Sequence, residues 1–123
     1  RRHDIAHRVI VAGFDPTATR PLRNAGFALG ASTPDVLGLL LPTLLGQRLA
    51  SPPFQALCLP LRWHGIPVPI AALARTLRAS GGVTHVWTIN DAGQALRLWR
   101  LGVQGIISDD PGLILAARRA AWS

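Results

Sequence analysis

The sequence contains no Met, Lys, Glu or Tyr and has a single cysteine, Cys58. One cysteine excludes an intrachain disulfide framework and a cysteine-based zinc cluster. No apolar run approaches the roughly 20 residues of a membrane span, because the longest, residues 36–46, is interrupted by Gly38 and Pro42. Without a starting Met, the chain is expected to be part of a longer protein.

The charge is unbalanced, because all 13 basic residues are Arg and all 6 acidic residues are Asp. The resulting formal charge of +7 favours polyanions or acidic membrane surfaces as partners. The Arg residues are scattered along the chain, and no alternation of basic and aromatic residues accompanies them. We therefore expect solvated Arg side chains and no nucleic-acid partner, while a membrane surface stays open as a partner.

Strand-like and helix-like segments alternate along the chain, and no second domain, repeat or low-complexity linker interrupts them. β-branched and apolar runs indicate strands, and Asp-Pro or Ser/Thr-Pro starts followed by apolar periodicity indicate helices. Strands joined by helices lie parallel. The predicted strands are residues 8–14, 27–31, 54–61, 83–89 and 106–107, and the predicted helices are 15–23, 32–49, 70–80, 92–101 and 110–119.

Two motifs near the carboxyl end are specific. Val86-Trp87-Thr88-Ile89-Asn90 is followed by Leu101-Gly102-Val103-Gln104-Gly105-Ile106-Ile107-Ser108-Asp109 and Pro111. This pattern resembles the glycerophosphodiester phosphodiesterase family, whose signature is V-W-T-V-N followed by G-V-D-G-I-I-T-D-x-P. Gln104 replaces an Asp and Ser108 replaces a Thr. The run from Val9 to Pro16 resembles an earlier family strand that ends Ser-Phe-Asp, with Gly13 in place of the Ser.

The resemblance implies a TIM (β/α)8 barrel of the phospholipase-C-like phosphodiesterase type. A whole barrel of this kind needs roughly 250 residues, and the chain has 123. We therefore expect residues 1–123 to form a partial domain, the C-terminal half of the barrel from about strand 4 to strand 8. The missing N-terminal half would be its structural partner.

The resemblance also implies hydrolysis of glycerophosphodiesters, or of lipid-derived substrates of that kind, to an alcohol and glycerol 3-phosphate. The family uses a divalent cation, calcium or magnesium, held by carboxylates, and two histidines for acid–base chemistry. Its motifs for these residues are His-Arg-Gly, Glu-x-Asp, a following His and Glu-x-Lys, and none occurs here. No catalytic or metal-binding residue is therefore assigned. The alternative is that the chain is a noncatalytic remnant or an interaction module. In one form of this alternative it associates with a membrane surface.

The resemblance assigns this chain the far wall of the substrate pocket, with Trp87 and Phe14 as substrate-binding residues. Arg62, Trp63 and His64 follow a predicted strand, so a barrel would place them on the rim where active-site loops gather. A core role for the two aromatic residues, and a solvated loop for the rim residues, remain open. Asn90 and Asp109 are expected to fix loops and cap helices.

Two further segments each have two interpretations. His3 and His7, four residues apart with Asp4 between them, share a helix face that is able to hold a metal, or they close a helix before the first strand. The leucine-rich helix at residues 32–49 is either an outer barrel helix or an apolar lid that meets lipid. The sequence does not fix the cellular compartment.

Overall fold

The computed structural model describes residues 5–47 and 52–123. Helices and strands alternate along this part of the chain, and the main strands pair in parallel, so the predicted α/β class is confirmed. The elements are η1 (Ala6–Arg8), β1 (Ile10–Val11), α1 (Pro16–Thr19), η2 (Arg20–Leu22), β2 (Ala28–Leu29), α2 (Thr33–Leu44), β3 (Ala56–Pro60), β4 (Arg62–Trp63), β5 (Ile66–Pro67), α3 (Ile70–Ala79), β6 (Val83–Trp87), α4 (Ala92–Arg100), β7 (Gly105–Ile106) and α5 (Pro111–Ala121).

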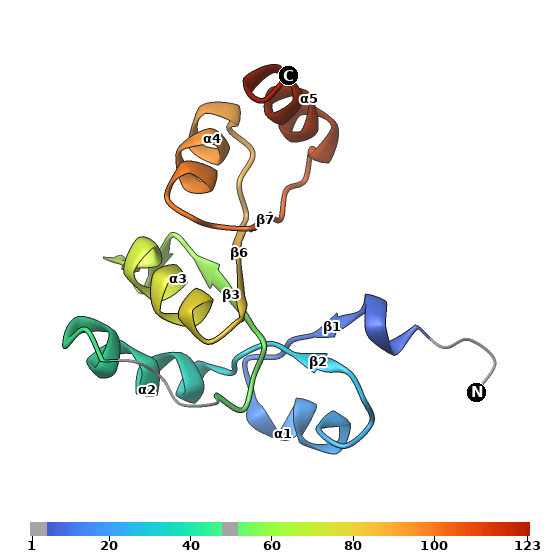
Figure 1. Cartoon of the computed structure of the whole chain (residues 1–123), viewed down its shortest axis with the longest axis vertical. Coiled ribbons are helices and arrows are strands. Elements are labelled where there is room, and N and C mark those ends of the chain that lie inside the picture. Colours follow the sequence, from blue (N-terminus) through green and yellow to red (C-terminus); the bar gives the residue numbers. More distant parts are fainter. Residues whose placement is uncertain (1–4, 48–51) are drawn as a thin grey trace.

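The parallel strands lie side by side in the order of the chain. β1 pairs with β2, and β3, β6 and β7 form a second sheet in that order. A parallel bridge between Gly30 and Ala56 connects the two sheets, and the Ala31 amide donates to the Ala56 carbonyl at 2.8 Å. Figure 1 shows the strands as an open, curved array with α2, α3 and α4 following one another along one side of it.

The core lies between this array and its helices. Leu57 and Leu59 of β3 are buried, whereas Cys58 and Pro60 between and beyond them are half-buried. This alternation means that one strand face packs on the helices and the other faces the concave side. The buried face meets apolar residues of α3 and α4, and the cluster includes Leu57, Leu59, Leu73, Leu77, Val86, Ala95 and Leu98.

The helix starts follow from short polar side chains, as the sequence predicted. Asp91 accepts a hydrogen bond from the Gln94 amide at 2.7 Å, and Asp110 accepts one from the Leu113 amide at 3.1 Å. The Ser32 amide donates to the Asp35 carboxylate at 2.9 Å at the start of α2. Each carboxylate satisfies an amide that the helix leaves unpaired, and its charge suits the helix dipole.

Replacing Asp110 with alanine is expected to lower the free energy of unfolding by about 1 kcal/mol. The reason is that the Leu113 amide loses its acceptor at the start of α5. Urea unfolding followed by circular dichroism measures the loss. Asp110→Asn keeps an acceptor oxygen and should retain most of the stability, whereas equal losses in both variants would contradict the capping role.

The structure corrects three predictions of extent. The strands predicted at 8–14 and 27–31 are only two residues long, Ile10–Val11 and Ala28–Leu29, and they pair only with each other over those two positions. The rim residues and the turn predicted after β3 form a short antiparallel hairpin, β4–β5, whose turn is at His64 and Gly65. The helix predicted to reach residue 49 ends at Leu44. Residues 48 and 49, like His3 and Asp4 of the suggested metal group, lie outside the described residues.

Candidate functional site

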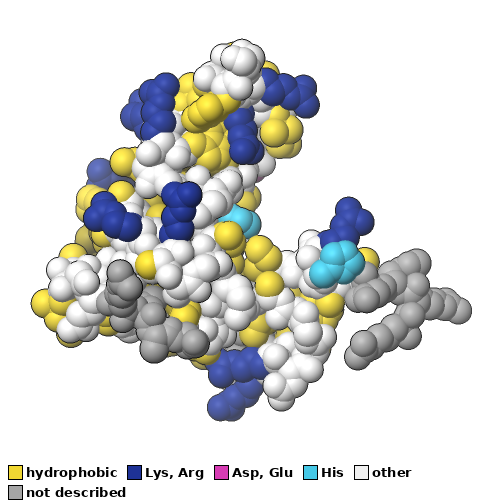
Figure 2. Space-filling view, viewed as in Figure 1, with side chains coloured by type: hydrophobic (Ala, Val, Ile, Leu, Met, Phe, Trp, Pro, Cys, Tyr) yellow, Lys and Arg dark blue, Asp and Glu magenta, His cyan; other side chains and the backbone are white. Residues whose placement is uncertain are grey.

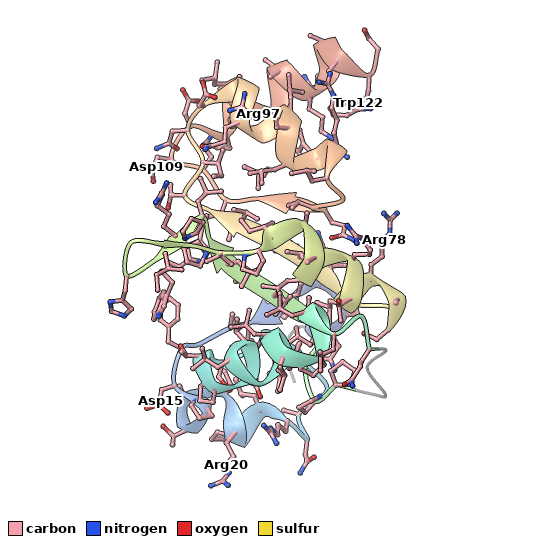
Figure 3. All side chains as sticks on the ribbon, turned by 90° about the vertical axis from the view of Figure 1, so that its left-hand side faces the viewer. Asp15, Arg20, Arg78, Arg97, Asp109 and Trp122 are labelled. Carbon is pink, nitrogen blue, oxygen red and sulfur yellow. The ribbon has the colours of Figure 1, made fainter. Side chains whose placement is uncertain are left out.

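The carboxyl ends of the parallel strands gather at one edge of the molecule. In Figure 3, Asp15, which follows β1, and Asp109, which follows β7, lie at the same edge, while Arg78 at the end of α3 lies at the opposite one. Parallel α/β folds place their ligands at the carboxyl ends of the strands. The candidate site is therefore this edge.

Aromatic side chains from three different strand ends meet at this edge. The ring centroids of Phe14 and Trp87 are 6.0 Å apart in an edge-to-face arrangement, and those of Phe14 and Trp63 are 6.3 Å apart. The ring of His64 lies edge-on to Trp63 with centroids 4.9 Å apart. Sequence positions 14, 63 and 87 are thus brought together, and such pairs stabilise one another beyond simple burial. Phe14 stays 61% exposed, so the cluster offers a ring face to solvent.

Arg62 lies in the same hairpin as Trp63, and one of its hydrogen-bond donors is used within the hairpin. One of its guanidinium nitrogens donates to the Gly65 carbonyl at 3.2 Å and closes the hairpin turn. His64 and Gly65 form that turn, with φ values of 48° and 78°. Arg62 therefore fixes the hairpin that carries Trp63, and it retains further donors for an anion.

Asn90 joins the two carboxyl-terminal motifs. Its Oδ1 accepts from the Asp109 amide at 2.9 Å and from the Ser108 hydroxyl at 3.0 Å, and its Nδ2 donates to the Asp109 carboxylate at 2.9 Å. Asp91, not Asn90, caps α4. The loop-fixing role of Asn90 and Asp109 was predicted, and the hydrogen bonds now define it. They hold the loop after β7 against the loop after Trp87.

An apolar groove opens beside the aromatic cluster. It has a volume of about 240 Å³ and lies between the first half of α2, the carboxyl end of β3 and the β4–β5 hairpin. Ser32 and Thr33 are its polar lining residues, and the Ser32 hydroxyl is engaged with the Asp35 carboxylate at 2.7 Å. The apolar lining residues include Phe14, Val36, Leu37, Leu40, Leu59, Trp63, Ile66 and Val68.

The concave strand face carries two titratable groups side by side. Cys58 and His85 are aligned in the β3–β6 register. Burial lowers the pKa of His85 and raises the pKa of the Cys58 thiol, because both environments disfavour the charged form. His85 and Cys58 are thus held neutral near pH 7.

At the site edge, hydrogen bonds from the Thr17 amide and hydroxyl lower the pKa of Asp15.

The lowered pKa of His85 predicts a pH dependence of stability. The folded state disfavours the imidazolium, so the unfolded state binds more protons as the pH falls through the unfolded pKa of about 6.5. Stability should be complete above that pH and decrease below it. His85→Asn should remove this part of the dependence, as measured by urea unfolding between pH 5 and 8. An unchanged pH profile in the variant would contradict the assignment.

The described residues do not fit a calcium or magnesium site. Within residues 5–47 and 52–123, no group of three or more His, Cys, Asp or Glu side chains is close enough to hold a metal ion. Asp35, Asp91 and Asp110 are engaged at helix starts. No step involving a cation is therefore built on the described residues.

A comparison with protein-family models shows which family the chain belongs to. The model described as the glycerophosphoryl diester phosphodiesterase family matches residues 50–113, which is more than half of the 123 residues. The chain belongs to this family. The match contains both motifs joined by Asn90. A search of curated proteins found no match to the chain.

In this member of the glycerophosphoryl diester phosphodiesterase family, sequence reasoning missed the groove. Its lining includes Leu37, which belongs to the leucine-rich segment predicted as either an outer helix or an apolar lid, and Ile66, which was not a candidate. One signal was available, because the leucines of residues 36–45 extend well beyond a single stripe, which is unusual for a helix with one buried face. Gln104, which replaces the family's Asp, accepts from the Thr84 amide at 2.9 Å and so fixes the start of β6.

Proposed function

We propose that the chain is the C-terminal portion, about strands 4 to 8, of a (β/α)8 barrel that hydrolyses glycerophosphodiesters to an alcohol and glycerol 3-phosphate. In this proposal the chain supplies the wall of the substrate pocket. The observation that carries it is the meeting of Phe14, Trp63 and Trp87 at the carboxyl ends of the strands, beside the two family motifs that Asn90 joins.

The chain order of the strands supports the barrel. Five parallel strands that neighbour one another in sequence order, with helices along one side, are the arrangement of consecutive barrel strands. Within the described residues, β1 and β7 each pair on one side. Strands from an N-terminal half are the partner that these edges fit, since an unpaired strand edge is a template for pairing.

The aromatic wall would position the substrate. An apolar ring face binds the carbon atoms of a glycerol or alcohol group and excludes water, which strengthens electrostatic interactions at the neighbouring phosphate. The free donors of Arg62 would attract the phosphate, because a guanidinium binds phosphate oxygens in a bidentate manner. These residues bind and orient the substrate, and none of them transfers a proton in the proposal.

The divalent cation and the acid–base histidines would come from the N-terminal half. A bound calcium or magnesium ion supplies charge stabilisation at the phosphate in the family. Because the described residues form no such site, the proposal assigns the cation ligands to strands outside this chain.

The proposal is tested with the full-length protein that contains this sequence. The protein is incubated with glycerophosphocholine in calcium or magnesium, and glycerol 3-phosphate is measured with a coupled dehydrogenase. We expect cation-dependent release that EDTA abolishes. No release with either cation from a folded full-length protein would contradict the proposal and favour the alternative of a noncatalytic interaction module.

A further inference from the structure

The described charges of the molecule lie at two opposite edges. The acidic side chains that the structure describes belong to segments where a helix begins, and they are Asp15, Asp35, Asp91, Asp109 and Asp110. A helix that follows a parallel strand begins near the carboxyl end of that strand and ends at the opposite edge. In Figure 3, Arg78 and Trp122 lie at the edge opposite Asp15 and Asp109. That edge is turned away from the candidate site.

Arginines from three consecutive helix ends gather at this opposite edge. Arg78 lies in the last turn of α3, Arg100 ends α4, and Arg118 lies in the last turn of α5. The Arg78 guanidinium reaches the end of α4, because a Cβ added to Gly102 would lie 3.9 Å from its Nη1 atom. Figure 2 looks onto this edge and shows, among its coloured residues, Arg side chains over α3, α4 and α5 and no acidic side chain. Arg78, Arg100 and Arg118 form the basic edge of the molecule.

The basic edge lies inside the strand array and not at its open ends. α4 follows α3 along the array and packs on α5, and the structure describes all three helices. Arg118 faces α4, because its Cζ atom lies 5.4 Å from the centroid of the Trp99 ring. An N-terminal half that pairs with β1 and β7 would extend the array beyond those strands. It would therefore leave these arginines with the neighbours that they have here.

The clustering of these cations favours an anionic partner. A single arginine in the last turn suits the helix dipole, but cations at three neighbouring helix ends repel one another. Residues 92–108 and 111–123 contain no acidic residue that would offset this repulsion. An anionic partner over the basic edge removes the repulsion and is attracted by the field of the arginines.

Two exposed apolar side chains beside the basic edge indicate the class of partner. Leu101 directly follows α4 and Trp122 directly follows α5, and each is 55% exposed. The Trp122 ring packs edge-to-face on Trp99, with centroids 5.9 Å apart, so it too stays on the α4 side. Indole and arginine side chains together are typical of surfaces that meet a membrane interface. A nucleic-acid strand instead follows a basic groove, and the groove described above is apolar and lies at the other edge.

We propose that the basic edge, with Leu101 and Trp122, docks the protein on an anionic lipid surface. Its guanidinium groups would bind phosphate and carboxylate oxygens of the head groups, and the indole would enter the headgroup layer. None of the described helices has the length and apolar character of a membrane span. The docking surface does not depend on the proposed function. It leaves the candidate site, at the opposite edge, facing water.

The test is vesicle binding by the full-length protein that contains this sequence. Vesicles of phosphatidylcholine with one-third phosphatidylserine are compared with vesicles of phosphatidylcholine alone, and bound protein is measured by co-sedimentation. We expect about tenfold tighter binding to the anionic vesicles at about 0.1 M salt, and the difference should disappear at about 0.5 M because salt screens the surface potential. Equal binding to both kinds of vesicle, or binding to neither, would overturn the proposal.

Single substitutions locate the surface. Arg78→Gln and Arg100→Gln should each weaken binding to the anionic vesicles about fivefold, and both combined with Arg118→Gln about 100-fold. Arg97→Gln is the matched control, because it removes the same charge from α4 but lies nearer the start of that helix, where a Cβ added to Gly93 would be 3.7 Å from its Nη1 atom. Its affinity should stay within twofold, with the circular dichroism of each variant unchanged. Equal losses in Arg97→Gln and Arg100→Gln would mean attraction by net charge alone and would overturn the docking surface.

Two other polyanions test the class of partner. A single-stranded oligonucleotide and polyaspartate are titrated into the protein at the same salt concentration as the vesicles. We expect both to bind about tenfold more weakly per charge than the anionic vesicles, since neither offers an interfacial layer for Leu101 and Trp122. Binding of either polymer that is as tight as vesicle binding and is lost in Arg100→Gln would overturn the assignment to a lipid surface.

Discussion

Replacing Trp87 with alanine in the full-length protein is expected to lower kcat/KM for glycerophosphocholine about 100-fold. A tryptophan buries roughly 150–250 Å², and losing about half of that contact at about 25 cal/mol per Å² costs about 2–3 kcal/mol. The indole also packs on Phe14 at 6.0 Å between ring centroids, so its removal loosens the remaining wall. Steady-state release of glycerol 3-phosphate measures the effect.

Two controls separate a pocket role from a general loss of structure. Trp87→Phe keeps an aromatic face and should lose less than about fivefold. Trp122→Ala removes an indole at the end of α5, far from the strand ends, that is 55% exposed, and it should leave kcat/KM within twofold. If Trp87→Ala were as active as Trp122→Ala, Trp87 would be a packing residue and the proposed wall would be wrong.

Replacing Leu77 with alanine should lower the free energy of unfolding by about 2–5 kcal/mol. Leu77 is fully buried at 0% exposure on α3 and belongs to the core cluster between α3 and the strands. Its side chain fills the space above Gly82, where an added Cβ would come within 2.5–2.9 Å of Leu77 carbon atoms. Shortening the side chain therefore opens a cavity that the neighbouring backbone cannot fill.

Urea unfolding of the chain measures the Leu77 effect, with Leu115→Ala as the comparison. Leu115 lies on α5 and is 49% exposed, so its truncation should cost less than about 1 kcal/mol. A Leu77→Ala variant as stable as Leu115→Ala would show that the helix–strand core is not the source of stability.

Local chemistry made the carboxyl-terminal half predictable. Asp91 and Asp110 stand at the helix starts, where a short carboxylate accepts a hydrogen bond from a backbone amide. Gly102 follows α4 with a positive φ of 99°, a conformation that commonly ends a helix and that glycine adopts without strain. The two motifs around Trp87 and Asp109 predicted the family, and the family match confirms that prediction.

The amino-terminal strands and the hairpin were harder to predict for physical reasons. The length of β1 depends on its pairing with β2, and pairing is a long-range property that a run of apolar residues does not specify. The hairpin had a local signal that was overlooked. His64-Gly65 occupies positive φ at both central positions, which is the requirement of a type I′ turn.

The candidate site also has a part that the sequence predicted and a part that it did not. The resemblance pointed to Trp87 and Phe14, and the neighbourhood of Trp63 followed from its place after a strand. The leucine-rich sequence indicated an apolar surface on α2, but the groove itself was not predicted, because it depends on how α2 lies against the hairpin and no sequence period encodes that contact. Whether a leucine such as Leu37 faces the core or solvent was decided by that packing.

The most direct test of the central claim is the intact mass of the protein as its own cells make it. The protein is captured with an antibody to residues 111–123, and its mass and any co-purifying chain are determined. The account predicts a polypeptide of at least about twice the 13.1 kDa of this chain, as a whole barrel requires. A mass near 13.1 kDa, with no co-purifying chain that supplies the remaining strands, would contradict the pocket-wall role and leave an interaction module.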